Sequence, residues 1–155
     1  MSAVTPSAGG AEYPISLAPG TEEAGLAIML ADLIRFNLAE DPRKWTDFNR
    51  LDRLFEIEAR DAAVTVTLEF NRGSLVVHGG RFGSPRVRIS ANSKTVLELA
   101  RIRIVHGIPN LFDSTGRDLL KKTLSGSVRI AGALGNLIAL VRVTRLMSVS
   151  DGKMR

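Results

Sequence analysis

Residues 55–70, FEIEARDAAVTVTLEF, hold two runs in which apolar and polar side chains alternate at every second position. The first run alternates apolar residues with charged ones, and the second alternates them with two threonines and a glutamate. A period of two is typical of a strand that is buried on one side. The stretch therefore predicts two strands that share one apolar face, and another apolar layer has to cover that face.

Two further strands are expected after this pair. Asn71–Gly73 is typical of a turn, and Ser74–His78 is predicted as the third strand. A glycine-rich turn follows, and then a fourth strand over Pro85–Ser90, in which Val87 and Ile89 alternate with arginines. Links this short favour antiparallel neighbours, so we expect a mainly antiparallel sheet.

The chain ahead of the first strand predicts a tail and two helices. Residues 1–20 are rich in Ala, Gly, Ser and Pro and show no periodicity, so they are expected to be a disordered tail. Thr21 is placed to cap an amphipathic helix over Glu22–Glu40, and Pro42 is placed to open a short second helix. Residues 21–150 are then expected to form a single domain.

The second half alternates helices with one more strand. Asn92 is a good N-cap for the helix that follows it, and Asp118–Leu124 and Leu134–Met147 have the apolar spacing of two more helices. A fifth strand is predicted over Ser127–Ala131. The apolar stretch Ile102–Asp113 is broken by a glycine and a proline, so it is expected either to fill the core or to line the mouth of a cavity.

The last predicted helix, Leu134–Met147, is apolar over far more than the stripe of about 100° that a surface helix buries. The helix is therefore either packed between the sheet and other helices, or turned with one side toward a hollow that holds an apolar ligand.

The amino-acid composition excludes several classes of protein and of metal site. The chain has 155 residues, no cysteine and two histidines, which excludes a disulfide scaffold, thiolate metal sites and a histidine-rich metal cluster. It has neither an apolar run of about 18 residues nor the start of a secretory signal, so a cytoplasmic location is expected.

Charge is distributed unevenly along the chain. Residues 1–80 hold 7 basic and 12 acidic side chains, whereas residues 81–155 hold 14 basic and 4 acidic ones. This asymmetry is typical either of a partner that bears phosphate or carboxylate, or of a solvated basic face.

Sequence motifs of catalysis are missing. G-x-S-x-G, H-E-x-x-H, a P-loop and a dinucleotide fingerprint are all absent, so no catalytic residue, metal or cofactor is expected. The strand period puts Glu56 and Glu58 on the polar face of their strand, where solvation is their expected role. Because aromatic residues make up only 5% of the chain, nucleic-acid binding is not favoured.

Two passages of the second half carry a resemblance to a known family. Val87–Ser93 leads into a helix, and Leu119–Gly135 leads into the closing helix. The second passage ends with three spaced glycines, Gly126, Gly132 and Gly135. In this order the passages resemble the sterol carrier protein 2 family, with the apolar stretch Ile102–Asp113 as an extra segment. The glycines alone are equally typical of turns with positive φ.

The resemblance implies an α+β fold, with a five-stranded, mainly antiparallel sheet covered on one face by helices and an apolar tunnel between the layers. Members of the family bind sterols, fatty acids, acyl-CoA or phospholipids. The resemblance thus implies non-catalytic binding, and transfer, of a hydrophobic small molecule or lipid, with an anionic membrane surface as a transient contact. The tunnel wall is expected to consist of Val64, Val66, Leu68, Val87, Ile89, Ile108, Leu111, Phe112, Leu134, Leu137, Ile138 and Val141.

Two other functions stay open. An enzyme built on the same hollow would use His78 or His106, together with a nearby acid, for proton transfer on an apolar substrate. An accessory interaction domain would instead use the apolar stretch and the basic face to contact a protein or a nucleic acid.

Overall fold

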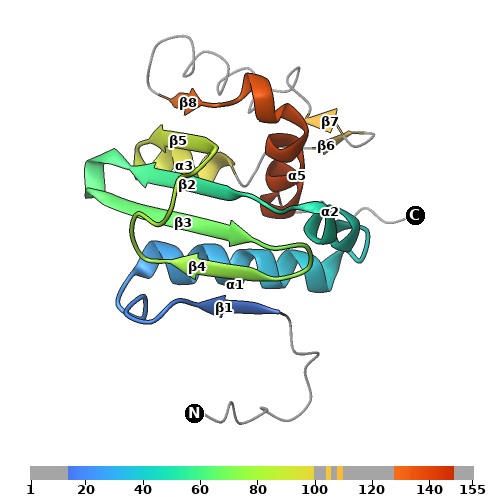
Figure 1. Cartoon of the computed structure of the whole chain (residues 1–155), viewed down its shortest axis with the longest axis horizontal. Helices are drawn as coiled ribbons and strands as arrows, with labels where there is room; N and C mark the ends of the chain where they lie inside the picture. The colour runs from blue at the N-terminus through green and yellow to red at the C-terminus, as the bar shows by residue number, and fades with distance from the viewer. Residues whose placement is uncertain (1–13, 100–103, 106–107, 110–127, 149–155) are drawn as a thin grey trace, which may run out of the picture.

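The structure is a computed structural model that describes residues 14–99, 104–105, 108–109 and 128–148 (Figure 1). The elements follow in the order β1 (Ile15–Leu17), α1 (Gly25–Glu40), α2 (Lys44–Arg50), β2 (Leu54–Ala59), the 3₁₀ turn η1 (Arg60–Ala62), β3 (Val64–Phe70), β4 (Leu75–His78), β5 (Val87–Ala91), α3 (Ser93–Leu99), β6 (Ile104–Val105), β7 (Ile108–Pro109), β8 (Arg129–Ala131), the 3₁₀ turn η2 (Leu134–Asn136) and α5 (Leu137–Met147). The predicted helix over Asp118–Leu124 lies outside the described residues.

Six strands form one sheet in the order β1-β4-β3-β2-β5-β8, and β6 and β7 form a separate pair. Three neighbouring pairs, β2-β3, β3-β4 and β5-β8, run antiparallel, and two pairs, β1-β4 and β2-β5, run parallel. The expected α+β class and mainly antiparallel sheet are confirmed. The predicted strand count of five is wrong, because the sheet has six.

The sixth strand is β1, which lies in the segment predicted to be a disordered tail. Ile15–Leu17 pairs in parallel register with β4, and the Arg35 guanidinium donates to the carbonyl oxygen of Ile15 at 3.0 Å. Three residues are too short to show a period of two, so only the pairing with β4 identifies the strand. The sheet thus includes residues that precede the predicted boundary at residue 21.

The expected antiparallel pairing of the fourth strand with its predecessor is also wrong. The link from His78 to Val87 crosses β3 and β2, so β5 pairs in parallel with β2 (Figure 1). The link is held to the sheet by the Thr67 hydroxyl, which donates to the carbonyl oxygen of Gly80 at 2.7 Å, and by the Arg86 amide, which donates to Leu54. Short links indicate antiparallel neighbours only where the two strands are adjacent.

The helix starts were predicted with mixed success. Asn92 caps α3, because its side-chain oxygen accepts the Thr95 amide at 2.8 Å. Thr21 does not cap α1: the helix begins at Gly25, and the buried Thr21 hydroxyl accepts the Gly79 amide at 3.0 Å instead. A side chain that prefers a helix start is therefore used here to hold the link after β4.

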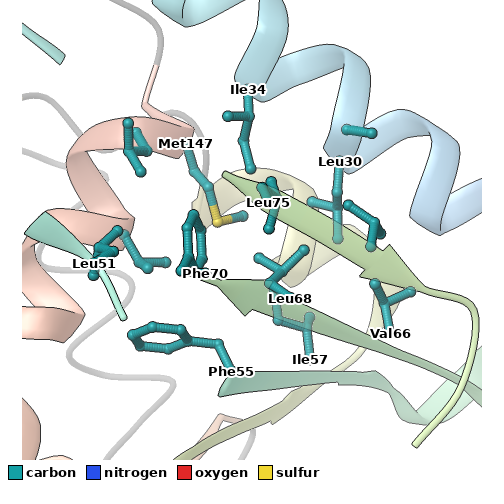
Figure 2. Packing of buried hydrophobic residues seen from close by; sticks show 14 of the residues in the cluster. Leu30, Ile34, Leu51, Phe55, Ile57, Val66, Leu68, Phe70, Leu75 and Met147 are labelled. Atoms are coloured by element: carbon teal, nitrogen blue, oxygen red, sulfur yellow. The ribbon is translucent and has the colours of Figure 1, made fainter. Parts of the chain in front are cut away.

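The core lies between the sheet and α1, with α2 and α5 closing one end. Leu30 and Ile34 of α1 face Leu68 and Leu75 of the sheet (Figure 2). At the closed end, Phe48, Phe55 and Phe70 meet edge to face, with ring centroids 5.7–6.2 Å apart. Such contacts add to the free energy that aromatic burial contributes. The apolar face predicted from residues 55–70 is the floor of this core.

Gly132 is one of the three glycines of the resemblance, and its backbone requires glycine. Its φ is +80°, and a Cβ at this position would overlap the carbonyl oxygen of Arg86. Gly135 has open space around it, and Gly126 lies outside the described residues. The turn between β8 and η2 therefore depends on one of the two described glycines.

We expect Gly132→Ala to lower the free energy of unfolding by at least about 1–3 kcal/mol, because the left-handed backbone is strained for alanine and the methyl group meets Arg86. Gly135→Ala is the matched control and should leave stability unchanged or raise it by about 0.4–1 kcal/mol. Urea unfolding of both variants measures this. Equal midpoints for the two variants would contradict the assignment.

Candidate functional site

Polar groups of α1 and α2 hold the carboxyl end of α5. The buried Asn37 side-chain amide donates to the carbonyl oxygen of Leu146 at 2.7 Å. The Lys44 ammonium donates to the carbonyl oxygen of Ser148, and burial lowers the pKa of Lys44 below its usual value. These donors satisfy carbonyl groups that have no partner within the last turn of a helix.

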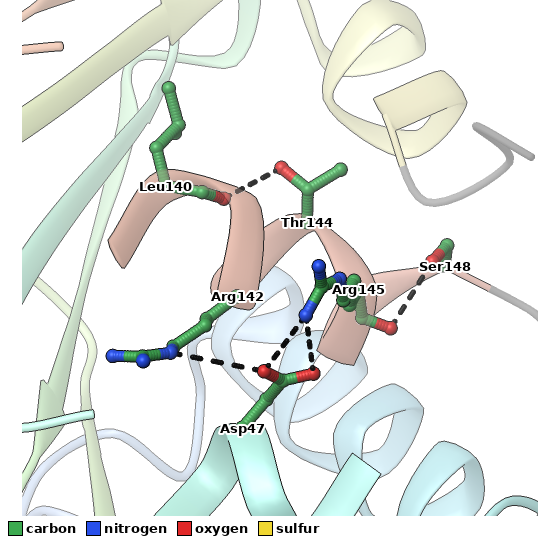
Figure 3. A network of polar contacts seen from close by, with 6 residues as sticks. All are labelled: Asp47, Leu140, Arg142, Thr144, Arg145 and Ser148. Atoms are coloured by element: carbon green, nitrogen blue, oxygen red, sulfur yellow. Dashed lines mark hydrogen bonds and ion pairs between the residues drawn. The ribbon is translucent and has the colours of Figure 1, made fainter. Parts of the chain in front are cut away.

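An ion cluster ties α2 to the side of α5 (Figure 3). Asp47 accepts a hydrogen bond from Arg145 at 3.2 Å, and Arg142 Nε lies 3.9 Å from the same carboxylate. Just ahead of the amino end of α5, Arg53 donates to the side-chain oxygen of Asn136. Contacts along the whole helix therefore set which of its sides faces the core.

With this rotation, α5 carries apolar side chains both toward the core and toward the outside. Its buried side chains are Ala139, Val143, Leu146 and Met147. By contrast Leu134 of the preceding turn η2 is 102% exposed, and Leu137 and Ile138 of α5 are 61% and 68% exposed. We call these three residues the α5 apolar face. β7 lies beside the same helix. Clustered aliphatic side chains at the surface are typical of a binding site, whereas single ones are not.

The residues predicted to wall a tunnel fall into separate places. The sheet members are in the core, with Val66, Leu68, Val87 and Ile89 buried and Val64 half-buried. Leu134, Leu137 and Ile138 form the exposed α5 apolar face, and Val141, one turn further along α5, is half-buried. Leu111, Phe112 and the side chain of Ile108 lie outside the described residues. The structure does not bring the sheet and helix members together, and a tunnel between the layers remains a prediction.

His78, the described histidine, lies on the outer face of the sheet. Its neighbour Val77 is fully buried on the inner face, so strand alternation turns His78 the other way. Its Nε2 lies 2.8 Å from a Glu69 carboxylate oxygen, and its ring stacks on Phe82. The expected histidine–acid pair therefore exists, but on the opposite face from the core. His106 lies outside the described residues.

Glu56 was expected to be solvated, and this was wrong. It is on the outer face as predicted, yet only 5% exposed. The link between β4 and β5 crosses this face and brings Arg81 Nε to 4.0 Å from the Glu56 carboxylate, and Arg88 Nε from β5 is equally far. The link covers the Glu56 carboxylate. Nothing in the local sequence of β2 indicates that this side chain is buried. Glu58 is half-buried, and the Ser90 hydroxyl donates to it at 2.9 Å.

No three His, Cys, Asp or Glu side chains among the described residues are grouped so that they could bind a metal ion. None of the helices in this part of the chain combines the length and the hydropathy needed to cross a membrane.

Comparison with known proteins shows the fold. No family model matches the sequence, and no curated protein matches it. The structure is similar to a UbiJ-SCP2 ubiquinone synthesis protein, with a TM-score of 0.57 and 16% identity over 79% of this chain and 96% of that one. It is also similar to the inverting sec-alkylsulfatase Pisa1 from Pseudomonas sp., with a TM-score of 0.55 and 15% identity over 87% of this chain but 18% of the other. The expected sterol carrier protein 2 fold is confirmed.

We expect Asn37→Ala to lower the free energy of unfolding by about 1–3 kcal/mol, because it leaves the buried Leu146 carbonyl without its donor. Asn49→Ala, at an exposed position of α2, is the control and should be close to neutral. Chemical denaturation followed by circular dichroism measures both. A neutral Asn37→Ala would show that this contact does not anchor α5.

Proposed function

We propose that this protein binds a lipid-like hydrophobic molecule against the α5 apolar face without catalysing a reaction on it. One observation carries the proposal: three large aliphatic side chains, Leu134, Leu137 and Ile138, are exposed together. The fold supports the proposal, since the sequence resembles the sterol carrier protein 2 family, whose members bind apolar ligands. The inner sheet residues pack against the helices. The proposal therefore places the ligand along α5 and β7 and not over the centre of the sheet.

The energetics of such a site need only apolar contact. Burial of ligand methylenes contributes about 0.8 kcal/mol each, so ten of them supply about 8 kcal/mol, which corresponds to a Kd of about 1 μM. Ordering the ligand and the side chains opposes part of this gain. Micromolar affinity without a charged anchor therefore needs a hydrocarbon chain that buries more than ten methylenes. His78 lies on the outer face of the sheet, so no described histidine supports proton transfer at this place.

A fluorescent fatty acid tests the proposal on the purified full chain. We expect saturable binding at micromolar concentration, and at least tenfold weaker binding for Leu137→Ser/Ile138→Ser, since each lost aliphatic contact costs about 1.5 kcal/mol or more. Met29→Ser/Phe36→Ser on α1 is the matched control, because it removes two side chains that are 50% and 53% exposed. The control should bind within about twofold of the unchanged protein.

Three results would contradict this function. One is the absence of saturable binding at micromolar lipid, and another is an equal loss in both double variants. The third is a concentration-dependent dimer that dissociates on Leu137→Ser/Ile138→Ser, since a second copy would then cover the α5 apolar face. Mass spectrometry of an organic extract of the fresh protein identifies the ligand that is retained.

A further inference from the structure

The outer side of α1 exposes two large apolar side chains. Leu30 and Ile34 point from α1 into the core (Figure 2), and the opposite side of the helix carries Met29 and Phe36, which are 50% and 53% exposed. Soluble helices usually place polar residues on this side. Two large apolar side chains seven residues apart on one outer side are typical of a helix that contacts another helix.

The exposed residues of this side follow the spacing of a helix–helix contact. They are Gly25, Met29, Asp32, Phe36 and Ala39, and the steps between them alternate between four residues and three. This alternation keeps side chains on one stripe of a helix, and it is the spacing of the contact positions in coiled coils. We call these five residues the α1 seam. It runs from the first turn of α1 to the last.

The α1 seam has the same order of residue classes in both directions. From either end it passes through a small residue, a large apolar one, Asp32, a large apolar one and a small residue. A two-fold axis that crosses the helix near Asp32 therefore places Met29 of one copy against Phe36 of the other. The same axis places Gly25 against Ala39. Copies related by a two-fold axis contact each other through one self-complementary surface, and a different protein would not require this symmetry.

Charges along α1 favour the antiparallel arrangement. Asp32 in the middle is paired with Arg35 at 2.8 Å, and reversal brings Asp32 of each copy close to Arg35 of the other. The central carboxylates are therefore not left without a cation when the copies meet. Glu23 ahead of the helix is exposed, and the Arg43 side chain beyond its end is 87% exposed, so reversal also brings these opposite charges together. A parallel pair would instead place each charge beside its own equivalent.

We propose that a second copy of this chain docks on α1, with the two helices antiparallel and the two α1 seams in contact. A helix of 16 residues is about 24 Å long, so the pair buries less surface than a standard interface. The dimer is therefore expected to be weak and reversible. The α1 seam shares no residue with the α5 apolar face, so the inference goes beyond the proposed function and does not rest on it.

Sedimentation velocity of the purified full chain, from micromolar to millimolar concentration, tests the dimer. We expect a concentration-dependent dimer whose dissociation constant rises at least about tenfold in Met29→Ser/Phe36→Ser, since four large apolar side chains lose their contacts in each dimer. Leu137→Ser/Ile138→Ser is the matched control, because it removes two exposed aliphatic side chains outside the α1 seam. The control should dimerise within about twofold of the unchanged protein.

Cross-linking tests the antiparallel orientation. The chain has no cysteine, so a single introduced cysteine reacts without background. Met29→Cys is mixed with an equal amount of a tagged Phe36→Cys, and the mixture is treated with a short bismaleimide. We expect the product that joins the two variants to exceed the products that join like variants. Thr46→Cys mixed with Asn49→Cys, both at exposed positions of α2, is the control and should give a statistical mixture in low yield.

A protein that stays monomeric up to millimolar concentration would overturn the inference, and so would equal weakening of the dimer in the two double variants. A predominance of products that join like variants would show a parallel pair and would overturn it too. Fatty-acid binding distinguishes this inference from the proposed function. A dimer without fatty-acid binding leaves the docking of a second copy standing, whereas fatty-acid binding by a monomer leaves only the proposed function standing.

Discussion

The rest of the structure depends on covering the apolar inner face of the central strands. β2, β3, β4 and β5 turn their buried apolar side chains to one side, and α1 packs against β3 and β4 on that side. Exposing that face would cost about 25 cal/mol for each Å² of apolar surface. One helix does not cover all of it, so α2 and α5 close the end where the aromatic side chains meet. The position of α5 follows from this requirement.

The polar contacts of α5 decide which of its apolar side chains face the core and which face outward. Asn37, Lys44 and Asp47 reach it from α1 and α2, and they leave the α5 apolar face outward. Soluble helices usually place polar residues on that side, because apolar surface in water is unfavourable. In the proposed function, a hydrocarbon ligand covers these aliphatic side chains and removes them from water.

The outer face of the sheet carries charged side chains, whereas the core face is apolar. The link from β4 to β5 covers Glu56 and brings Arg81 within 4.0 Å of its carboxylate, so the buried acidic group lies beneath an exposed basic one. The side chains of Arg81 and Arg88 are themselves 72% and 57% exposed.

Local pattern by itself determined the strands β2 to β5, the Val87–Arg88 alternation and the Asn92 cap, since each depends on near neighbours in the chain. It also identified the fold, through the order of these elements. The need for glycine at position 132 comes in part from the distant Arg86 carbonyl, so the tertiary structure decided it. Only the tertiary structure decided that Ile15–Leu17 is a strand, that β5 runs parallel to β2, that Glu56 is buried and that Leu137 and Ile138 face outward. The physical reason is that partners distant in sequence make these choices: β4 pairs with Ile15–Leu17, the link after β4 covers Glu56, and α2 sets the rotation of α5.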